Sequence, residues 1–452
     1  MTSDAASSRE YPRGRPDLRV PHSVPLLVGL VAAAAIAVWL QYRYIPAGTR
    51  YWGLFHNGID LEVYRAGARH LYHDQPIYLG PVLAHFEYTY TPFSTIVFQP
   101  FIAFDHHTVL VVWSVLIGLA LWWVVVAAFR SLGYHMDIWL IVMSALLVAV
   151  CTLMEPVRTT IWYGQINVFL MALVMWDLLR PDGSRLKGLG VGVAAGIKLT
   201  PAMFIVYLAA TRRWRAVLVS VAALVATIVA GAAVTPRGSL RYWTHRIFES
   251  QLVGDPRTPS NQSINGALAS IYNTSTPPQA LWLVLALIGL VLGIAAAWVA
   301  HRRGEELLAV AVTGMTSSVV SPFSWGHHWV WFVPLLVYLL HRVLAAVRTR
   351  RWVSAAAWAA ATSALYLTVF IWRFHIPHPV HIGRSRFAEF YGIGLFMVPR
   401  DSWLNWFCDQ PYLWVFAATA VTVLVGWAPA VIREVRGASP APAEGSDVGA
   451  RR

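Results

Sequence analysis

Two acidic side chains stand two residues apart just after the first long apolar run of the chain. Asp60 and Glu62 lie within the aromatic segment 51–64, and the long apolar runs that follow are nearly free of acids. A carboxylate in such a place can act as a general base that takes the proton from an attacking hydroxyl group. The ordinary alternative is that both acids are simply solvated in a loop. We predict that 51–64 is a loop and that Asp60 is a catalytic base, with Glu62 and Tyr64 binding substrate.

Lys187 and Lys198 are the only lysines in a chain that is rich in arginine. Lys198 lies in the middle of an apolar stretch, where an ionisable group is costly unless it has a function. An ammonium group there can bind an anionic lipid phosphate. The alternative is a lysine that marks a helix end and extends toward water. We predict that Lys198 binds the phosphate of a donor substrate.

Amide, hydroxyl, aromatic and histidine side chains gather in three further polar segments. Amides such as Gln165 and Asn167 can hydrogen-bond sugar hydroxyls, or they can stabilise a loop by binding its backbone. His327 and His328 are adjacent, so they cannot both face one ligand from a regular helix, and we expect a phosphate contact from this pair in place of a metal. The remaining substrate-binding candidates are Asn261, Gln262, Ser324 and Trp325. Trp325 can equally belong to the interfacial belt of aromatic residues.

The composition requires a membrane protein. Of 452 residues, 57% are hydrophobic and 13% are charged, and several apolar runs are uninterrupted. Because the bilayer core has no water to bind exposed backbone groups, such runs must be helices, and they are too continuous for barrel strands. The formal charge of +13 is scattered between the runs and forms no basic stripe for nucleic acid. The sequence predicts an all-α polytopic fold with about 11 to 12 transmembrane or half-membrane helices. It predicts no cofactor or metal, and no disulfide framework from Cys151 and Cys408.

The apolar region forms one transmembrane catalytic domain, 23–432, between two polar tails. The tails, 1–22 and 433–452, have the composition of disordered segments, and we expect both in the cytoplasm. The first run, 23–42, is read as an anchor because its small residues lie in its middle, whereas a cleavable signal peptide would end in them. Extracytoplasmic loops are expected at 43–106, 155–164, 236–278, 321–327 and 373–411.

The stretch 188–210 is expected to enter the membrane and return to the same side. Both of its flanks are basic, with Lys187 before it and Arg212 after it. Because short basic loops prefer the cytoplasm, both flanks should lie at one face. Pro201 disfavours helix at the preceding residue and lacks a backbone donor, so two half-helices should meet near Lys198. The lysine would then sit in a recess that opens to the outer side.

The residues named so far resemble a known family, the GT-C membrane glycosyltransferases. Within that family they are most similar to the polyprenyl-phosphomannose-dependent α-1,2-mannosyltransferases that elongate phosphatidylinositol mannosides. The likeness extends over about residues 25–432. The residues that carry it are Asp60, Val63, Tyr64, Ala66, Gly164, Gln165, Asn167, Lys198, Pro201, Asn261, Gln262, Ser263, Ser321, Pro322, Ser324, Trp325 and His328.

The resemblance implies a multi-pass plasma-membrane enzyme with its active site on the extracytoplasmic side. It implies transfer of mannose from polyprenyl-phosphate-mannose to a phosphatidylinositol tetramannoside, giving the pentamannoside with inversion. In this family the acidic residue after the first span is the expected base, which corresponds to Asp60. The resemblance leaves a metal role for Glu62 open, although we expect none because Lys198 can supply the positive charge.

Two other functions fit parts of the sequence. A related GT-C enzyme would use another donor, for example an arabinofuranosyl lipid, with the same residues. A transporter or lipid flippase would show internal repeats and broken helices in corresponding places of two halves. The sequence has one break and no visible repeat, which favours the transferase. The expected partners are therefore the lipid-linked donor, the glycolipid acceptor and membrane lipids, and not nucleic acid.

Overall fold

The structure is a computed structural model, and it describes residues 18–45, 52–249, 252–376, 380–382, 385–387, 390–399 and 402–437. The tails expected to be disordered lie outside these residues, except for 18–22 and 433–437. Within the described residues, five helices are long and apolar enough to cross a membrane. These five are α1 (Val24–Arg43), α4 (His106–Ser131), α10 (Trp214–Val234), α13 (Gln279–Arg302) and α18 (Pro411–Gly437).

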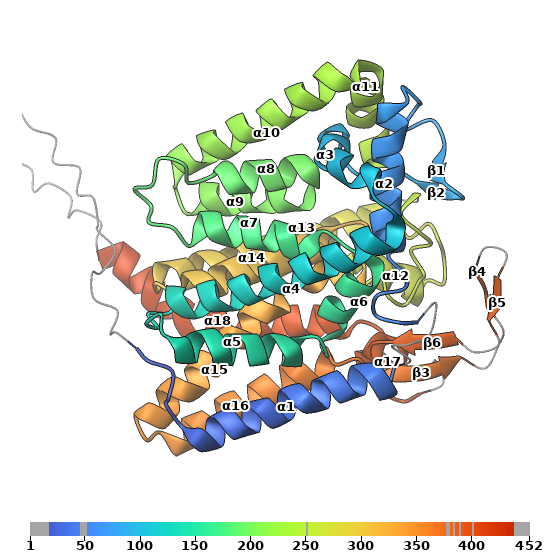
Figure 1. Cartoon of the computed structure of the whole chain (residues 1–452). Coiled ribbons are helices and arrows are strands. Elements are labelled where there is room, and N and C mark those ends of the chain that lie inside the picture. The colour runs from blue at the N-terminus through green and yellow to red at the C-terminus, as the bar shows by residue number, and fades with distance from the viewer. Residues whose placement is uncertain are drawn as a thin grey trace, which may run out of the picture.

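Shorter apolar helices complete the bundle, and their axes follow those of the long helices (Figure 1). They are α5 (Ile138–Cys151), α7 (Asn167–Leu178), α8 (Leu189–Ile197), α9 (Met203–Ala210), α14 (Glu306–Val320), α15 (Phe332–Arg348) and α16 (Trp352–Thr368). Large apolar side chains such as Val28, Leu218 and Val291 remain exposed on the long helices, as expected where lipid replaces water. The predicted all-α membrane fold is confirmed.

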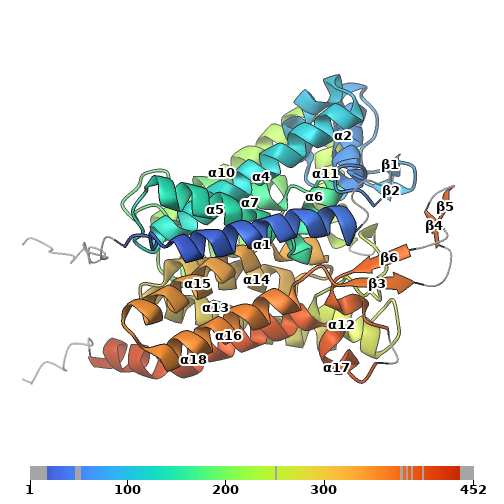
Figure 2. The ribbon, with the colours of Figure 1, turned by 60° about the horizontal axis from the view of Figure 1, so that its bottom comes forward.

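One end of the bundle carries a cap of short elements, and α1 begins and α18 ends at the opposite end (Figures 1 and 2). The cap contains α2 (Ile59–Tyr72), α3 (Pro92–Val97), α11 (Pro236–Thr244), α12 (Ile264–Ile271) and α17 (Asn405–Cys408). It also contains the strands β1 (Pro81–Leu83), β2 (Phe86–Glu87), β3 (Arg373–Ile376), β4 (Val380–Ile382), β5 (Ser385–Phe387) and β6 (Phe390–Ile393). The strands form three antiparallel pairs, β1 with β2, β3 with β6, and β4 with β5.

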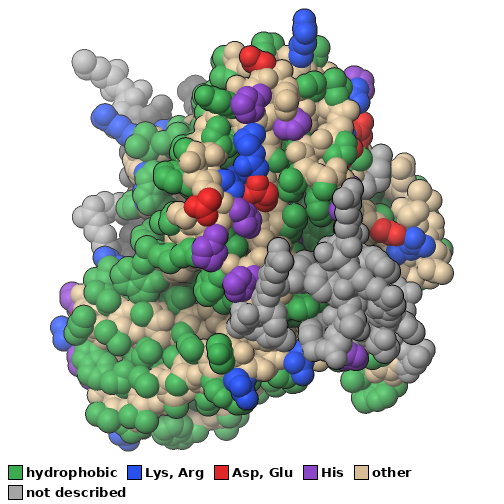
Figure 3. Space-filling model, turned by 45° about the vertical axis from the view of Figure 1, so that its right-hand side comes forward, with side chains coloured by type: hydrophobic (Ala, Val, Ile, Leu, Met, Phe, Trp, Pro, Cys, Tyr) green, Lys and Arg blue, Asp and Glu red, His purple; other side chains and the backbone are tan. Residues whose placement is uncertain are grey.

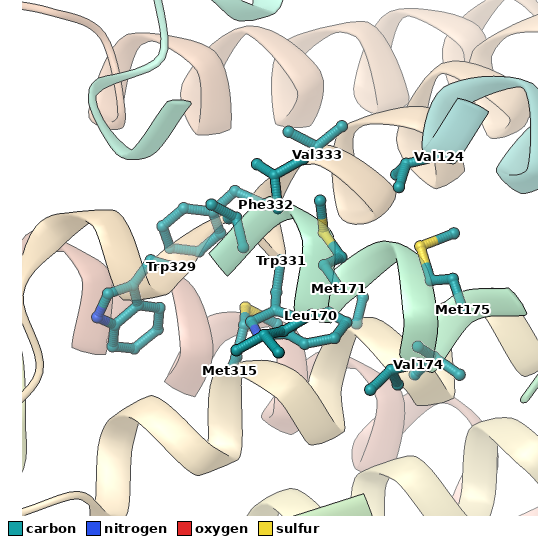
Figure 4. Close-up of a cluster of buried hydrophobic side chains, with 14 of the residues drawn as sticks. Val124, Leu170, Met171, Val174, Met175, Met315, Trp329, Trp331, Phe332 and Val333 are labelled. Atoms are coloured by element: carbon teal, nitrogen blue, oxygen red, sulfur yellow. The ribbon is translucent and has the colours of Figure 1, made fainter. Parts of the chain in front are cut away.

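The buried core lies between α4, α7, α14 and α15. Side chains such as Met171, Met315 and Phe332 pack together there, as Figure 4 shows. α14 is the central helix, because every residue from Leu307 to Val319 is buried. Helices also approach closely where residues are small: a Cβ added to Gly192 of α8 would lie 2.2 Å from the carbonyl oxygen of Ser220 in α10.

The hairpin predicted for 188–210 is present. α8 ends at Lys198, whose backbone is extended (φ −143°, ψ 130°), and α9 follows after one 3-10 turn that contains Pro201. The two basic flanks meet, because Arg213 Nε lies 3.1 Å from Asp182 Oδ1. The break at the lysine and the return of the chain to the same end are therefore confirmed.

The segments predicted as loops contain short helices, and two of these helices carry or adjoin the candidate site. Asp60 lies in the first turn of α2, and the segment 155–164 forms α6 (Glu155–Tyr163) and its cap. α6 starts with a proline in its first turn and ends at Gly164 in the left-handed conformation (φ 69°), which are ordinary helix boundaries. These helices were missed because they are short and polar in sequence, whereas the prediction searched for long apolar runs. α6 and α7 meet at an angle of 117°.

Candidate active site

The start of α2 is fixed against the junction between α6 and α7. The Asn57 side chain accepts a hydrogen bond from the Ile59 backbone N–H (3.0 Å), and the Gly58 N–H donates to the carbonyl of Trp162 (2.9 Å). Gly58 has φ 60° and Gly164 has φ 69°, so both positions favour glycine. This close contact between the two chain segments brings the first turn of α2 to the residues that follow α6.

Asp60 is held by an amide whose orientation is fixed. Gln165 Nε2 donates to Asp60 Oδ2 over 2.5 Å. The other end of the amide, Oε1, accepts from the hydroxyls of Tyr64 (2.8 Å) and Tyr90 (3.2 Å), and these two hydroxyls lie 2.7 Å apart. Because hydroxyl donors occupy the oxygen, the NH₂ group must face the carboxylate. The amide therefore supports the acid and leaves its second oxygen for another proton donor.

The environment makes Asp60 a stronger base than an ordinary aspartate. Burial raises its pKa to about 6, although the hydrogen bond from Gln165 and the charge of Lys198 both act to lower it. The two charged groups form no ion pair within the described residues, so the carboxylate keeps a substantial affinity for protons. Such a group is ionised at neutral pH and can still accept a proton readily.

Lys198 lies at the break between α8 and α9, where the chain leaves the helix. The Thr91 hydroxyl donates to the carbonyls of Gly196 and Ile197, which the end of α8 leaves without helical partners. The lysine Nζ donates to Asn167 Oδ1 (2.9 Å) and lies 5.1 Å from the centre of the Tyr90 ring. Tyr90 thus contacts the amide that supports Asp60 and also the ammonium group of Lys198.

The two adjacent histidines have different surroundings. His328 Nε2 lies 3.1 Å from Lys198 Nζ, and the ring lines a narrow cleft together with Thr200 and Ser318. The His327 ring is buried, 5.6 Å from the ring of Tyr163 between centroids. His327 contributes its backbone carbonyl, which accepts from Asn167 Nδ2 over 2.8 Å. His328 is therefore the histidine that faces the lysine.

Glu62 points to another part of the molecule. Its carboxylate accepts hydrogen bonds from Arg65 Nη1 (2.5 Å), from Arg69 and from His106 Nδ1 (2.9 Å). Burial alone would raise its pKa, but the hydrogen bonds from His106 and Arg69 and the charge of Arg65 lower the pKa to about 2. Figure 3 shows histidine, basic and acidic side chains gathered on the face of the molecule that the cap forms. The structure therefore places the Glu62 carboxylate against Arg65, Arg69 and His106 and not beside Gln165, which holds Asp60.

Three other substrate-binding candidates hold loops together. Asn261, Gln262 and Ser324 are fully buried. Asn261 Oδ1 accepts from the Ser324 backbone N–H (3.0 Å), and Gln262 Nε2 donates to the carbonyl of Asp409 (3.0 Å). Trp325 lies beside the site, with its ring stacked on His327 at a centroid distance of 6.2 Å. The amides therefore connect segments of the cap and have no contact with Asp60.

Sequence reasoning missed two residues near the site. Tyr90 was not singled out, although tyrosine and threonine alternate from residue 88 up to Pro92. Glu155 is buried at the start of α6 and accepts from the Tyr412 hydroxyl (2.6 Å). A Cβ added to Gly326 would lie 2.3 Å from its carboxylate, so Glu155 supports the turn that carries both histidines.

Residues 88–322 match the description "Glycosyltransferase family 87". The chain belongs to this family. The matched region contains Gln165, Asn167 and Lys198, whereas Asp60 precedes it and His328 follows it. Within the described residues, no group of three or more His, Cys, Asp or Glu side chains is placed to hold a metal ion.

Relatives with curated names extend the similarity beyond the matched region. A polyprenol-phosphate-mannose-dependent alpha-(1-2)-phosphatidylinositol pentamannoside mannosyltransferase of Mycobacterium tuberculosis is 32% identical over 83% of this chain and 86% of its own length. Its namesake from Mycolicibacterium smegmatis is 32% identical over 86% of this chain and 93% of its own length. A phosphatidylinositol mannoside mannosyltransferase of M. tuberculosis is 34% identical over 62% of this chain and 70% of its own length. No solved structure matches the chain.

Proposed function

We propose that this enzyme transfers mannose from polyprenyl-phosphate-mannose to a phosphatidylinositol mannoside, converting the tetramannoside to the pentamannoside in α-1,2 linkage. The observation that carries the proposal is that a carboxylate and an ammonium group form no ion pair but are connected through Tyr90, which contacts Lys198 and the amide that holds Asp60. Asp60 is supported by Gln165, and Lys198 is supported by Asn167 and His328. The donor and acceptor classes are taken from the names of the mannosyltransferase relatives.

The reaction follows from the two charges. Asp60 takes the proton of the acceptor hydroxyl as its oxygen attacks the anomeric carbon of mannose. The bond from this carbon to the donor phosphate breaks, and the phosphate leaves with the electron pair. Lys198 stabilises the negative charge that develops on the phosphate. Attack from the face opposite the phosphate turns a β-linked mannosyl phosphate into an α-mannoside, and no nucleotide is needed.

We further propose that the cap faces the extracytoplasmic side of the plasma membrane. The hairpin flanks at the opposite end carry Lys187, Arg212 and Arg213, and short basic loops prefer the cytoplasm. Both native cysteines are buried, so single introduced cysteines can be labelled in intact cells with little background. Gln75→Cys, which is exposed at the end of α2, should react with an impermeant thiol reagent, whereas Arg130→Cys at the end of α4 should not. The reverse pattern would contradict this orientation.

The donor and acceptor are tested with purified protein and synthetic lipids. We expect radiolabelled mannose to pass from polyprenyl-phosphate-mannose to the tetramannoside and to be released by an α-1,2-specific mannosidase. Label taken only from an arabinofuranosyl lipid would replace the donor assignment. Lipid movement across vesicles without any transferase product would instead support the flippase alternative.

A further inference from the structure

Three arginines line one open cavity at the end of the bundle opposite the cap. Arg302 and Arg303 come from the end of α13 and the residue after it, Arg342 comes from α15, and Trp427 comes from α18. The cavity has a volume of about 330 Å³, and Glu305 is the acidic residue in its lining. Figures 1 and 2 show that these helix segments lie far from α2, so the cavity is separate from the candidate site at Asp60.

Two of these arginines carry uncompensated charge. Arg303 Nη1 lies 3.3 Å from Glu434 Oε1 in an exposed pair. In the described part of the chain, by contrast, no carboxylate lies within 4 Å of Arg302 or Arg342. Outside the cavity, by comparison, Arg213 at the same end of the bundle is paired with an acid, since its Nη1 lies 2.6 Å from Glu306 Oε1. Among the described residues, the cavity therefore carries three arginines against Glu305 and Glu434, which is an excess of positive charge.

Aromatic contacts hold the two unbalanced guanidinium groups in place. Arg342 lies 4.6 Å from the centre of the Trp358 ring and donates to the Tyr338 hydroxyl over 2.9 Å. Arg302 lies 5.9 Å from the centre of the Trp298 ring. A guanidinium group has five N–H donors, so these contacts leave donors that can bind an anion. Arginine positioned in this way suits the oxygens of a phosphate.

The cavity lies near the ends of α13 and α15, where lipid headgroups are expected beside a membrane bundle. Arg342 is six residues before the end of α15, which is about 9 Å along the helix axis. Tryptophans such as Trp427 are typical of this interfacial zone. A phosphate held by arginines at this level of the bundle fits the headgroup of a lipid in the adjacent leaflet.

We propose that this cavity binds the headgroup of an anionic phospholipid from the leaflet at this end of the bundle. The phosphodiester contacts Arg302 and Arg342. The ligand is neither donor nor acceptor, since it lies at the opposite end from Asp60. The proposal therefore does not depend on the sugar that the enzyme transfers.

The test measures lipid binding to the full-length protein in a neutral detergent by native mass spectrometry. Phosphatidylglycerol and phosphatidylcholine with the same acyl chains serve as probes. We expect wild-type protein to retain one phosphatidylglycerol at least about tenfold more tightly than phosphatidylcholine, and the double variant Arg302→Gln and Arg342→Gln to lose this preference. Arg130→Gln is the matched control, because Arg130 is exposed at the same end of the bundle outside the cavity. An equal loss in this control, or no preference in wild-type protein, would overturn the proposal.

Two further measurements keep the result interpretable. Inorganic phosphate is added in a separate titration: displacement of the lipid at low millimolar phosphate would mean that the cavity is a free-anion site, which contradicts the proposal. If the double variant folds poorly, the single variant Arg342→Lys replaces it, because it keeps the charge but loses the planar donor group. It should bind phosphatidylglycerol more weakly than wild type, and wild-type affinity would count against the assignment. Mannosyl transfer measured in phosphatidylcholine should stay unchanged in each variant.

Discussion

Asp60 and Glu62 are two carboxylates on the first turn of the same helix, and their surroundings shift their pKa values in opposite directions. Two residues along a helix are rotated by about 200°, so the side chains point to opposite sides. Asp60 meets a neutral amide, and burial raises its pKa to about 6. Glu62 meets two arginines and a histidine, which lower its pKa to about 2. A base must retain affinity for a proton, whereas a carboxylate that connects cations must remain charged.

The largest effect is expected from Asp60→Asn. Removal of a general base slows the reaction by about 100-fold to 10,000-fold, and kcat should fall by an amount in this range. The melting temperature should not fall, because the substitution removes a buried charge and keeps an oxygen for Gln165. Asp74→Asn is the control, since Asp74 is exposed after α2 and its φ of 53° suits asparagine. Near wild-type turnover in Asp60→Asn would exclude this residue as the base.

Lys198→Gln tests the second charged group of the candidate site. Loss of one group that stabilises the departing anion typically lowers kcat by about 100-fold to 1,000-fold. Lys187→Gln provides the comparison, because Lys187 Nζ bonds the carbonyls of Leu178 (2.9 Å) and Arg180 (2.6 Å) at the far end. We expect Lys187→Gln to lower the melting temperature and to keep the turnover of folded enzyme. Similar kinetic losses in both variants would contradict a specific role for Lys198.

Gln165→Glu would place a second carboxyl group next to Asp60, as in a pair of acids that share one proton. The new carboxyl group removes the NH₂ donor and adds negative charge, and both changes raise the pKa of Asp60. A rise of one to two pH units would lower activity at pH 7 by about tenfold or less, with recovery at higher pH. Gln75→Glu, at an exposed position after the same helix, should leave the profile unchanged. A uniform loss at every pH would mean that Gln165 does not act through Asp60.

The pH dependence of the wild-type activity tests the contrast between Asp60 and Glu62 without any substitution. The pKa of Asp60 is raised, so the carboxylate is available above about pH 6 and becomes protonated below it. We expect kcat/KM to fall about tenfold per pH unit below this value. Glu62 remains ionised there because its pKa is lowered to about 2. Circular dichroism should therefore show folded protein at pH 5, and a plateau of activity down to pH 4 would contradict the assignment.

The hairpin at 188–210 was predicted more completely than the cap, because the two regions differ in the sequence patterns that indicate their structure. The basic flanks of 188–210 and the proline at 201 identify a return and a break, and both follow from membrane physics. By contrast, α2 and α6 are short helices whose polar side chains contact other parts of the protein, and a search for apolar runs cannot find them. Their boundaries depend on glycines that accept left-handed conformations, at Gly58 and Gly164.

In the candidate site, too, some residues could be recognised from the local sequence, whereas the roles of others depend on the folded structure. Asp60 and Lys198 were found because a charge near or within a membrane segment is unusual in itself. The roles of amides could not be assigned in this way, since Gln165 and Gln262 have the same chemistry. Gln165 bonds the carboxylate of Asp60, whereas Gln262 bonds backbone carbonyls of the cap. Only the three-dimensional contacts distinguish the two.

Glu62→Gln is expected to give the smallest kinetic effect, although the altered residue is only two positions from the base. The amide cannot bond both arginines and His106 as the carboxylate does, so unfolding should become easier by about 1 to 3 kcal/mol. The stability that Glu62 provides is present above its unfolded pKa of about 4.5 and is lost as the pH falls toward 2, because its folded pKa is the lower one. The variant should thus lose stability at pH 7 and show a weaker loss on acidification, measured by thermal unfolding. Its kcat should stay within about threefold of wild type. A larger loss of kcat, with an unchanged melting temperature, would place Glu62 in the chemistry and would remove the contrast with Asp60.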